Sequence, residues 1–267
     1  MVDKERLDLL LTERGLSKTR EKAKREIMAG NVYVSGQLKD KPGKKFPKDA
    51  DISLKRDRKR YVSRGGRKLE HALKEFDLDV EGCKVVDIGA STGGFTDCLL
   101  DNGAKEIWAI DVGKGQLDWG LRQDSRVQPI EGKNARYLQP EEIGTPVGLV
   151  TIDVSFISLK LILPRAKDLL TEDGKIICLV KPQFEAGPDR VEDGGVVTDP
   201  EVHRDVLVDI AEQAKKDGMT VADCTYSPIR GKSSKNIEYF LYLTGSGNSL
   251  KTKELVEVVE AARRHFD

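Results

Sequence analysis

One stretch, residues 85–97, constrains the fold of this chain more than any other. Its sequence, VVDIGASTGGFTD, reads as a buried strand, a glycine-rich turn and the start of a helix. Glycine lets the backbone come close to a bound molecule, and the first N–H groups of a helix are free to bind one. The stretch therefore predicts a nucleotide-type cofactor loop at the end of a strand.

The spacing within this loop limits the choice of cofactor. It does not match G-x-G-x-x-G, and no Gly-Lys-Ser/Thr follows it, so it predicts neither a dinucleotide nor a phosphate loop. Asp87 ends the strand and can orient the loop or meet a cationic ligand, which suits the ammonium and sulfonium of S-adenosylmethionine. A glycine-rich turn without a ligand is the alternative. The residues of this segment that we expect to bind the cofactor are Asp87, Gly89, Ala90, Ser91, Thr92, Gly93, Gly94 and Phe95.

Strand and helix patterns alternate from residue 84 to the end of the chain. The predicted strands are 85–88, 107–111, 127–130, 148–153, 175–181, 221–226 and 238–243. The predicted helices are 94–102, 117–123, 158–170, 200–217 and 250–266. Such alternation is typical of an α/β fold with a doubly wound, mostly parallel sheet of Rossmann-like type.

Ligands of such sheets bind outside the carboxyl ends of the strands, so the residues at those ends are candidates for a site. Asp111 follows the glycine turn by about 20 residues and can accept both ribose hydroxyls of the cofactor. Asn134, just beyond the third strand, is placed to meet an adenine edge. Asp153 and Lys181 end two further strands, and Asp153 is a candidate for cofactor binding as well as for catalysis.

The net charge of zero hides a division of the chain into a basic and an acidic part. Residues 1–68 contain 21 Lys+Arg and only 10 Asp+Glu, a net charge of +11, and the remainder carries −11. A basic domain of this kind is typical of nucleic-acid binding. We therefore expect a small α+β domain at 1–60 and a larger α/β domain at 61–267.

The basic domain begins with two predicted helices. The first contains the leucines of residues 7–11 and ends at Gly15, and the second begins with Ser17 as N-cap and ends at Gly30. Strands are predicted at 31–37 and 52–54, with a lysine-rich Pro/Gly loop between them. The residues expected to bind RNA are Arg6, Ser17, Lys18, Arg20, Lys22, Lys24, Arg25, Lys41, Arg64 and Arg67.

The segment GLSKTREKAKREIMAGNVYVSG, followed by a Lys-Pro-Gly loop, resembles the S4-type RNA-binding domain. The resemblance implies that the second helix and the turn before it lie against folded RNA. Lysine and arginine on an exposed helix can neutralise phosphates and release counterions. A small basic fold that contacts protein is the alternative.

Four charged residues are candidates for the catalytic chemistry: Lys68, Asp153, Lys181 and Glu238. We expect Gly65 and Gly66 to break any helix, so that a helix begins at Lys68. If the last strand is antiparallel, Glu238 at its start lies at the same sheet edge as Asp153 and Lys181. Lysines and carboxylates in one cleft would satisfy each other, and such a lysine can hold and polarise a hydroxyl.

These four residues resemble the K-D-K-E set of FtsJ-type RNA ribose 2′-O-methyltransferases. The segments SRGGRKL, DVGKGQL, DVSFISL, LVKPQFE and SPIRGKSSKNIEYF, behind an S4-like head, resemble the TlyA (hemolysin A) family over essentially the whole chain. The resemblance implies S-adenosylmethionine-dependent 2′-O-methylation of a cytidine ribose in ribosomal RNA, within ribosomal subunits. Lys181 would steer the hydroxyl, Asp153 and Glu238 would fix Lys181, and Lys68 would complete the field.

Other features concern the location of the protein and the remaining candidate sites. No apolar run reaches about 18 residues and the N-terminus lacks an apolar signal region, so we expect a cytoplasmic protein with no membrane contact. The four cysteines are scattered, which predicts buried free thiols and no metal site. The glycine-rich residues 185–199 form either a mobile lid or an ordinary surface connection.

Three alternative functions remain open at this point. Methylation of a base usually requires an Asn-Pro-Pro-Tyr-like motif or a catalytic cysteine, and the sequence shows neither. A non-catalytic, rRNA-binding ribosome-assembly factor would keep the fold without the chemistry. A membrane-active haemolysin would need an amphipathic membrane segment, which is not evident.

Overall fold

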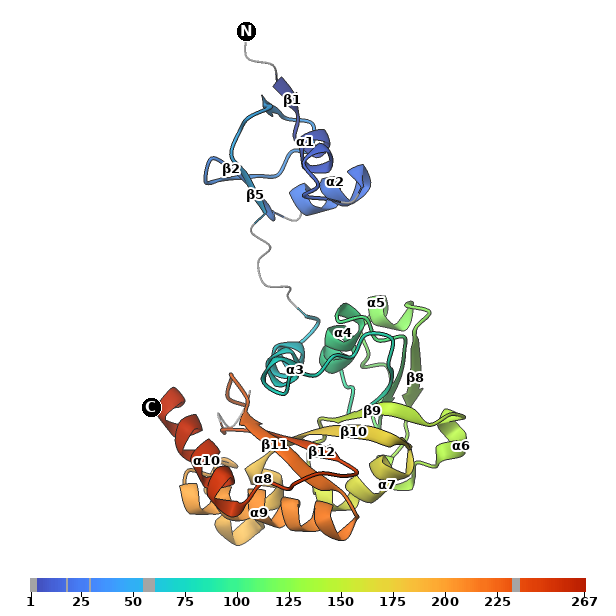
Figure 1. Ribbon diagram of the computed structural model, residues 1–267, viewed down its shortest axis with the longest axis vertical. Coiled ribbons are helices and arrows are strands. Elements are labelled where there is room, and N and C mark those ends of the chain that lie inside the picture. The colour runs from blue at the N-terminus through green and yellow to red at the C-terminus, as the bar shows by residue number, and fades with distance from the viewer. Residues whose placement is uncertain (1–3, 18, 29, 55–60, 232–235) are drawn as a thin grey trace. The chain divides into compact units, whose positions relative to one another are not determined.

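The computed structural model describes residues 4–17, 19–28, 30–54, 61–231 and 236–267. The chain divides into two compact units, residues 1–60 and 61–267 (Figure 1). The charged run RDRKRYV at 56–62 predicts a linker, and most of it lies outside the described residues. Each unit has its own hydrophobic core, and the two are considered in turn.

The first unit packs two helices against short antiparallel strands. The helices are α1 (Leu7–Glu13) and α2 (Arg20–Met28). The strands are β1 (Lys4–Arg6), β2 (Val32–Val34), β3 (Gln37–Lys39), β4 (Lys45–Pro47) and β5 (Ile52–Leu54). They form a β3-β2-β5 sheet and a β1-β4 pair. Leu7 and Leu11 of α1 meet Ala23 and Ile27 of α2 in the core, so burial of these apolar stripes holds the unit together.

The start of α2 differs from the prediction. The helix begins at Arg20, and Thr19 caps it, because the N–H of Lys22 donates to Thr19 Oγ1 at 3.2 Å. Ser17 is not the N-cap, since its hydroxyl donates to the Thr19 carbonyl at 3.3 Å. The strands β1, β3 and β4 were not predicted, because their sequences KER, QLK and KFP contain none of the β-branched residues typical of strands.

The second unit is built on one seven-stranded sheet with the order β11-β12-β10-β9-β6-β7-β8. Its strands are β6 (Lys84–Ile88), β7 (Glu106–Asp111), β8 (Val127–Glu131), β9 (Val147–Ile152), β10 (Leu170–Val180), β11 (Thr220–Tyr226) and β12 (Tyr239–Thr244). β12 is antiparallel to both of its neighbours, and the pairs among β10, β9, β6, β7 and β8 are parallel. The predicted mostly parallel α/β sheet is confirmed.

Helices cover both faces of this sheet (Figure 1). They are α3 (Arg64–Glu75), α4 (Gly94–Asp101), α5 (Trp119–Arg122), α6 (Pro140–Ile143), α7 (Leu163–Asp168), α8 (Pro182–Glu185), α9 (Pro200–Lys216) and α10 (Thr252–Phe266). Short 3₁₀ turns lie at η1 (Ala135–Tyr137), η2 (Leu159–Leu161) and η3 (Pro188–Arg190). Consecutive residues of β6 enter different cores, Val85 with α3 and α4, Val86 with α7 and α9. Burial on both faces explains the continuous apolar run of this strand.

The start of α3 is the clearest error of the sequence prediction. The helix begins at Arg64, not at Lys68, and Ser63 Oγ accepts the N–H of Gly65 at 3.2 Å as its N-cap. Gly65 and Gly66 lie in the first turn, where a Cβ on Gly66 would come within 2.2 Å of the Tyr61 ring. Close packing therefore explains why glycine stands at position 66. Lys68 lies one turn further along, among the buried residues of the helix.

The cysteines are free thiols, as predicted, and three of the four are buried. Cys98, Cys178 and Cys224 are buried free thiols, and Cys83 is free and half-buried. Within the described ranges, no three His, Cys, Asp or Glu side chains are grouped as metal ligands would be. None of the described helices is both long enough and apolar enough to span a membrane.

Candidate active site

A cavity of about 1000 Å³ opens at the carboxyl ends of β6, β7 and β9. Its walls include Gly89 and Ser91 of the glycine turn, together with Asp111, Asn134 and Asp153. The structure thus brings together residues that were predicted from strand ends far apart in the sequence. Its position outside the carboxyl edge is the usual ligand position in such sheets.

The glycines of the turn are required by the protein backbone itself. Gly89 has a φ of +86°, and a Cβ there would lie 2.4 Å from the carbonyl oxygen of Asp153. Gly93 has a φ of +95°, and its Cβ would lie 2.3 Å from Leu121. Positive φ and close approach both exclude side chains. The turn is therefore held in one conformation by the strand and helix beside it.

Asp111 lies on the cavity wall with both carboxylate oxygens held by backbone amides. The N–H of Ser91 donates to Oδ2 at 2.8 Å, and the N–H of Gly113 donates to Oδ1 at 2.7 Å. Each carboxylate oxygen has a further lone pair, so Asp111 can still accept hydrogen bonds from hydroxyl groups. Asn134 is fixed similarly, because its Oδ1 accepts the N–H of Arg136 at 3.0 Å.

Asp87 lines neither this cavity nor the second cavity described below, which corrects its expected role in cofactor binding. Its carboxylate is fully buried and accepts hydrogen bonds from Thr96 Oγ1 at 2.7 Å and Thr151 Oγ1 at 3.1 Å. Burial raises the pKa of Asp87 to about 7, although the two hydroxyls oppose this shift. Asp87 instead ties α4, which follows the glycine turn, to β9.

A second cavity of about 600 Å³ is lined by three of the four predicted catalytic residues and adjoins the first. Lys68, Lys181 and Asp153 line it, together with glycine-turn residues. The residues shared by the walls of both cavities are Gly89, Ser91, Asp153 and Ser155. A ligand in the first cavity would therefore lie beside a ligand in the second. Phe95 also contributes to this wall, although its ring is buried against that of Phe240.

Lys181 is held at the end of β10 by two partners. Its Nζ lies 2.6 Å from Asp153 Oδ1 in an ion pair and donates to Ser155 Oγ at 3.0 Å. The ion-pair contact lacks good hydrogen-bond geometry. The lysine is 9% exposed, so it faces the cavity from a largely buried position. Ser155 was not among the predicted site residues.

Lys68 forms the other ion pair, with Glu238. Because β12 is antiparallel to β10, the residue before Tyr239 lies beside the end of β10, as predicted. Both side chains are nearly buried, and only Lys68 lines the cavity. The expected pairing is corrected in one respect: Glu238 contacts Lys68, and Asp153 contacts Lys181. The four residues therefore form two lysine–carboxylate pairs.

Two aromatic residues on the wall of the first cavity, and Glu185 next to one of them in the chain, were not predicted as site residues. Glu185 accepts hydrogen bonds from Ser158 Oγ at 2.6 Å and from the N–H of Leu159 at 2.8 Å. It thereby joins the segment after β9 to α8, which directly follows Lys181. Phe156 is 90% exposed on the wall of the first cavity with a φ of +63°, and its ring lies 4.9 Å from that of Phe184. The motifs DVSFISL and KPQFE contain these residues but give no sign of their contacts.

The glycine-rich residues 185–199 are fastened to the sheet. Asn236 accepts the N–H of Val197 at 2.8 Å and donates to the Gly195 carbonyl at 2.8 Å. His203 bridges the Val197 carbonyl and the Tyr239 hydroxyl. These contacts favour an ordinary connection over a mobile lid.

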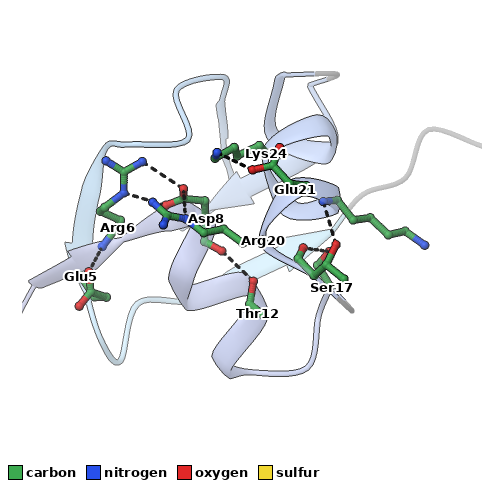
Figure 2. Close-up of polar contacts among 10 residues, drawn as sticks. Glu5, Arg6, Asp8, Thr12, Ser17, Arg20, Glu21 and Lys24 are labelled. Carbon is green, nitrogen blue, oxygen red and sulfur yellow. Dashed lines mark hydrogen bonds and ion pairs between the residues drawn. The ribbon is translucent and has the colours of Figure 1, made fainter.

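The residues predicted to bind RNA fall into four groups. Lys22, Lys41, Arg64 and Arg67 are exposed, and Arg64 donates to the Arg230 carbonyl at 2.7 Å beside the second cavity. Figure 2 shows that Arg6 and Arg20 contact Asp8 and that Lys24 pairs with Glu21. Ser17 is buried, which argues against its expected contact with RNA. Lys18 and the side chain of Arg25 lie outside the described residues, as do the lysines of 232–235.

Comparison with known families agrees with this division of the chain. Residues 61–244 match the FtsJ-like methyltransferase family. Residues 5–52 match the S4 domain. The two matches fall within the two compact units described above.

Several relatives match the chain over nearly its full length. YqxC of Bacillus subtilis is 50% identical over 98% of this chain and 95% of that protein. The protein named 16S/23S rRNA (cytidine-2′-O)-methyltransferase TlyA, from Mycobacterium tuberculosis, is 42% identical over 98% of both chains. A solved structure from Streptococcus thermophilus, which carries a hemolysin name, is 45% identical over 100% of this chain and 98% of that one, with a TM-score of 0.75. The chain therefore belongs to the FtsJ-like methyltransferase family, among the members that carry an S4 domain and include TlyA.

Proposed function

We propose that the chain transfers a methyl group from S-adenosylmethionine to the 2′-hydroxyl of a cytidine ribose in ribosomal RNA. The observation that carries this proposal is the pair of lysine–carboxylate contacts in a cavity that shares Asp153 and glycine-turn residues with a larger neighbour. The activity named for the Mycobacterium tuberculosis relative supports the choice of substrate.

The larger cavity has the donors and acceptors that S-adenosylmethionine requires. Asp111 would accept the ribose hydroxyls, and Asn134 would meet the adenine edge. The backbone of the glycine turn would hold the amino-acid part. When bound, S-adenosylmethionine supplies a methyl group that is already activated for transfer.

Lys181 is then the residue that steers the acceptor. An ammonium group has three donors; Ser155 accepts from one of them, and Asp153 forms an ion pair with the group. A remaining donor can bind the ribose 2′-oxygen and favour loss of its proton. Lys68 and Glu238 form a second ion pair and add to the electrostatic field in the cavity. Because the methyl donor is activated, correct placement of the hydroxyl should dominate the rate.

The S4 domain would deliver this site to folded rRNA within ribosomal subunits in the cytoplasm. Its exposed Lys22 and Lys41 can neutralise phosphates, and its net positive charge gives the attraction a long range. In the methyltransferase domain, Arg64 on the wall of the second cavity and the exposed Arg67 would contact further phosphates. An assembly factor without catalysis would have no use for two charge pairs placed beside a cofactor cavity.

The experiment is the substitution Lys181→Ala, measured by methyl transfer and by titration with S-adenosylmethionine. We expect transfer to fall about 100-fold or more, because the steering donor is lost, while cofactor affinity stays within about twofold. Lys84→Ala is the matched control, since Lys84 lies at the opposite end of β6, where it pairs with Glu106. An active Lys181→Ala enzyme would show that the charge pairs have another purpose.

A further inference from the structure

Asp8 of the S4 domain is a buried carboxylate shared by two arginines. It lies in the first turn of α1 and is 0% exposed. Arg6 Nε donates to Oδ1 and Arg6 Nη2 to Oδ2, both at 3.0 Å, and Arg20 Nε donates to Oδ2 at 3.0 Å. Figure 2 shows the two guanidinium groups converging on this one side chain.

The contacts with Asp8 leave much of each guanidinium available. Arg6 contacts the Asp8 carboxylate through Nε and Nη2, so the N–H groups of its Nη1 remain available. Arg20 contacts the carboxylate through Nε. The two arginine side chains are 37% and 48% exposed, whereas the carboxylate between them is fully covered. Donors on two arginines are therefore presented at the surface from β1 and α2, with the carboxylate behind them.

The charge of the cluster suits an anion. Burial alone would raise the pKa of Asp8, but the hydrogen bonds from Arg6 and Arg20 outweigh it and hold the pKa at about 2. The carboxylate is thus ionised at neutral pH, and the three side chains together carry one positive charge. Both arginines are partly exposed, and ion pairs with exposed partners contribute little to stability. Stability alone is therefore a weak explanation for this cluster.

We propose that Asp8 is a positioning residue that holds Arg6 and Arg20 as one binding site for a phosphate of the RNA backbone. The proposal rests on the proposed function, since it assumes an RNA substrate. Guanidinium groups bind phosphate through paired N–H donors, and their orientation decides whether both can reach it. Nearby acids have other partners: Glu5 accepts the Arg6 N–H at 2.7 Å, and Glu21 pairs with Lys24.

The substitution Asp8→Asn separates positioning from simple attraction. It adds one positive charge to the S4 domain, so attraction alone predicts tighter RNA binding with a steeper salt dependence. Positioning predicts the opposite, because the amide cannot accept from both arginines at both of its polar atoms. We expect the dissociation constant for deproteinised 16S and 23S rRNA to rise about tenfold, as for the loss of one charged hydrogen bond.

Asp49→Asn in the full-length protein is the matched control. It makes the same change of charge on the same domain at an exposed side chain. We expect it to leave rRNA binding unchanged or slightly tighter. Equal effects of Asp8→Asn and Asp49→Asn would overturn the positioning role, as would tighter binding by Asp8→Asn.

Two further measurements keep the result interpretable. If Asp8→Asn fails to fold, Arg6→Lys replaces it, because lysine preserves the charge and loses the two-point contact with Asp8. Weaker rRNA binding by this variant supports the proposal, and wild-type affinity overturns it. A wild-type protein that neither binds nor methylates rRNA would contradict the proposed function itself, which is a different outcome.

Discussion

Burial decides which of the predicted acidic residues can meet a ligand. Asp111 and Asp153 line the first cavity, whereas Asp87, in an equally suggestive position of the sequence, is buried in the protein. Its hydroxyl partners Thr96 and Thr151 come from α4 and β9. The sequence shows that an acid ends the strand but not which way its side chain turns.

The raised pKa of Asp87 predicts a specific pH dependence of stability. The folded protein keeps a proton on this group up to about pH 7, whereas an unfolded chain releases it near the ordinary value of 3.8. The contribution of Asp87 to the stability of the folded protein is therefore present below about pH 4 and is lost as the pH rises towards 7. In the Asp87→Asn variant the side chain cannot ionise, so this loss of stability with rising pH does not occur.

Urea unfolding of both proteins at pH 5 and pH 8 tests this expectation. The free energy of unfolding of Asp87→Asn, relative to wild type, should increase between the two pH values by on the order of 2 kcal/mol. A constant difference would mean that Asp87 is ionised in the folded protein at both pH values.

Among the elements, the long ones were predictable and the close contacts were not. The strands of the large sheet and the longer helices beside it follow from apolar runs and helical periodicity in the sequence, and the antiparallel β12 was anticipated as a condition for bringing Glu238 to the site. The start of α3 was predicted wrongly, because Gly66 is fixed by Tyr61 and Gly94 by Ser63, contacts that no periodicity reveals. The pairing of Lys68 with Glu238 and of Lys181 with Asp153 likewise depends on side-chain directions.

The substitution Gly89→Ala tests whether the glycine turn requires the absence of a side chain at position 89. The Cβ would meet the backbone carbonyl of Asp153, which cannot move without shifting the site, so we expect a loss of about 3 kcal/mol of stability and of most cofactor affinity. Gly115→Ala is the control, because Gly115 also has positive φ but faces open space. It should cost only about 1–2 kcal/mol. Similar stability and cofactor affinity for the two variants would contradict the close approach at Gly89.

At the scale of the whole molecule, charge and chemistry are divided between the two units. The S4 domain lies within the basic part of the sequence, and the two charge pairs of the site lie in the methyltransferase domain. Each unit has its own apolar core, so each has the means to stay folded without the other.

Removal of residues 1–60 should therefore separate the two activities. The remaining protein should bind S-adenosylmethionine with unchanged affinity, because both cavities lie within 61–267. Its affinity for rRNA should fall, and the slope of log affinity against log salt should become shallower by about 0.7–0.9 for each phosphate that the S4 domain no longer neutralises. Filter binding across a salt series measures both quantities, and unchanged rRNA affinity would remove the delivery role of the S4 domain.

The central claim, transfer to a ribose hydroxyl, is tested most directly by the chemical position of the label. Purified protein is given methyl-labelled S-adenosylmethionine with undermethylated ribosomal subunits, free rRNA or tRNA, and the RNA is then digested with alkali. A methylated 2′-hydroxyl cannot attack its neighbouring phosphate, so we predict label in an alkali-resistant dinucleotide from ribosomal substrates. Label in mononucleotides would show that a base is the acceptor and would contradict the roles given to Lys68, Asp153, Lys181 and Glu238.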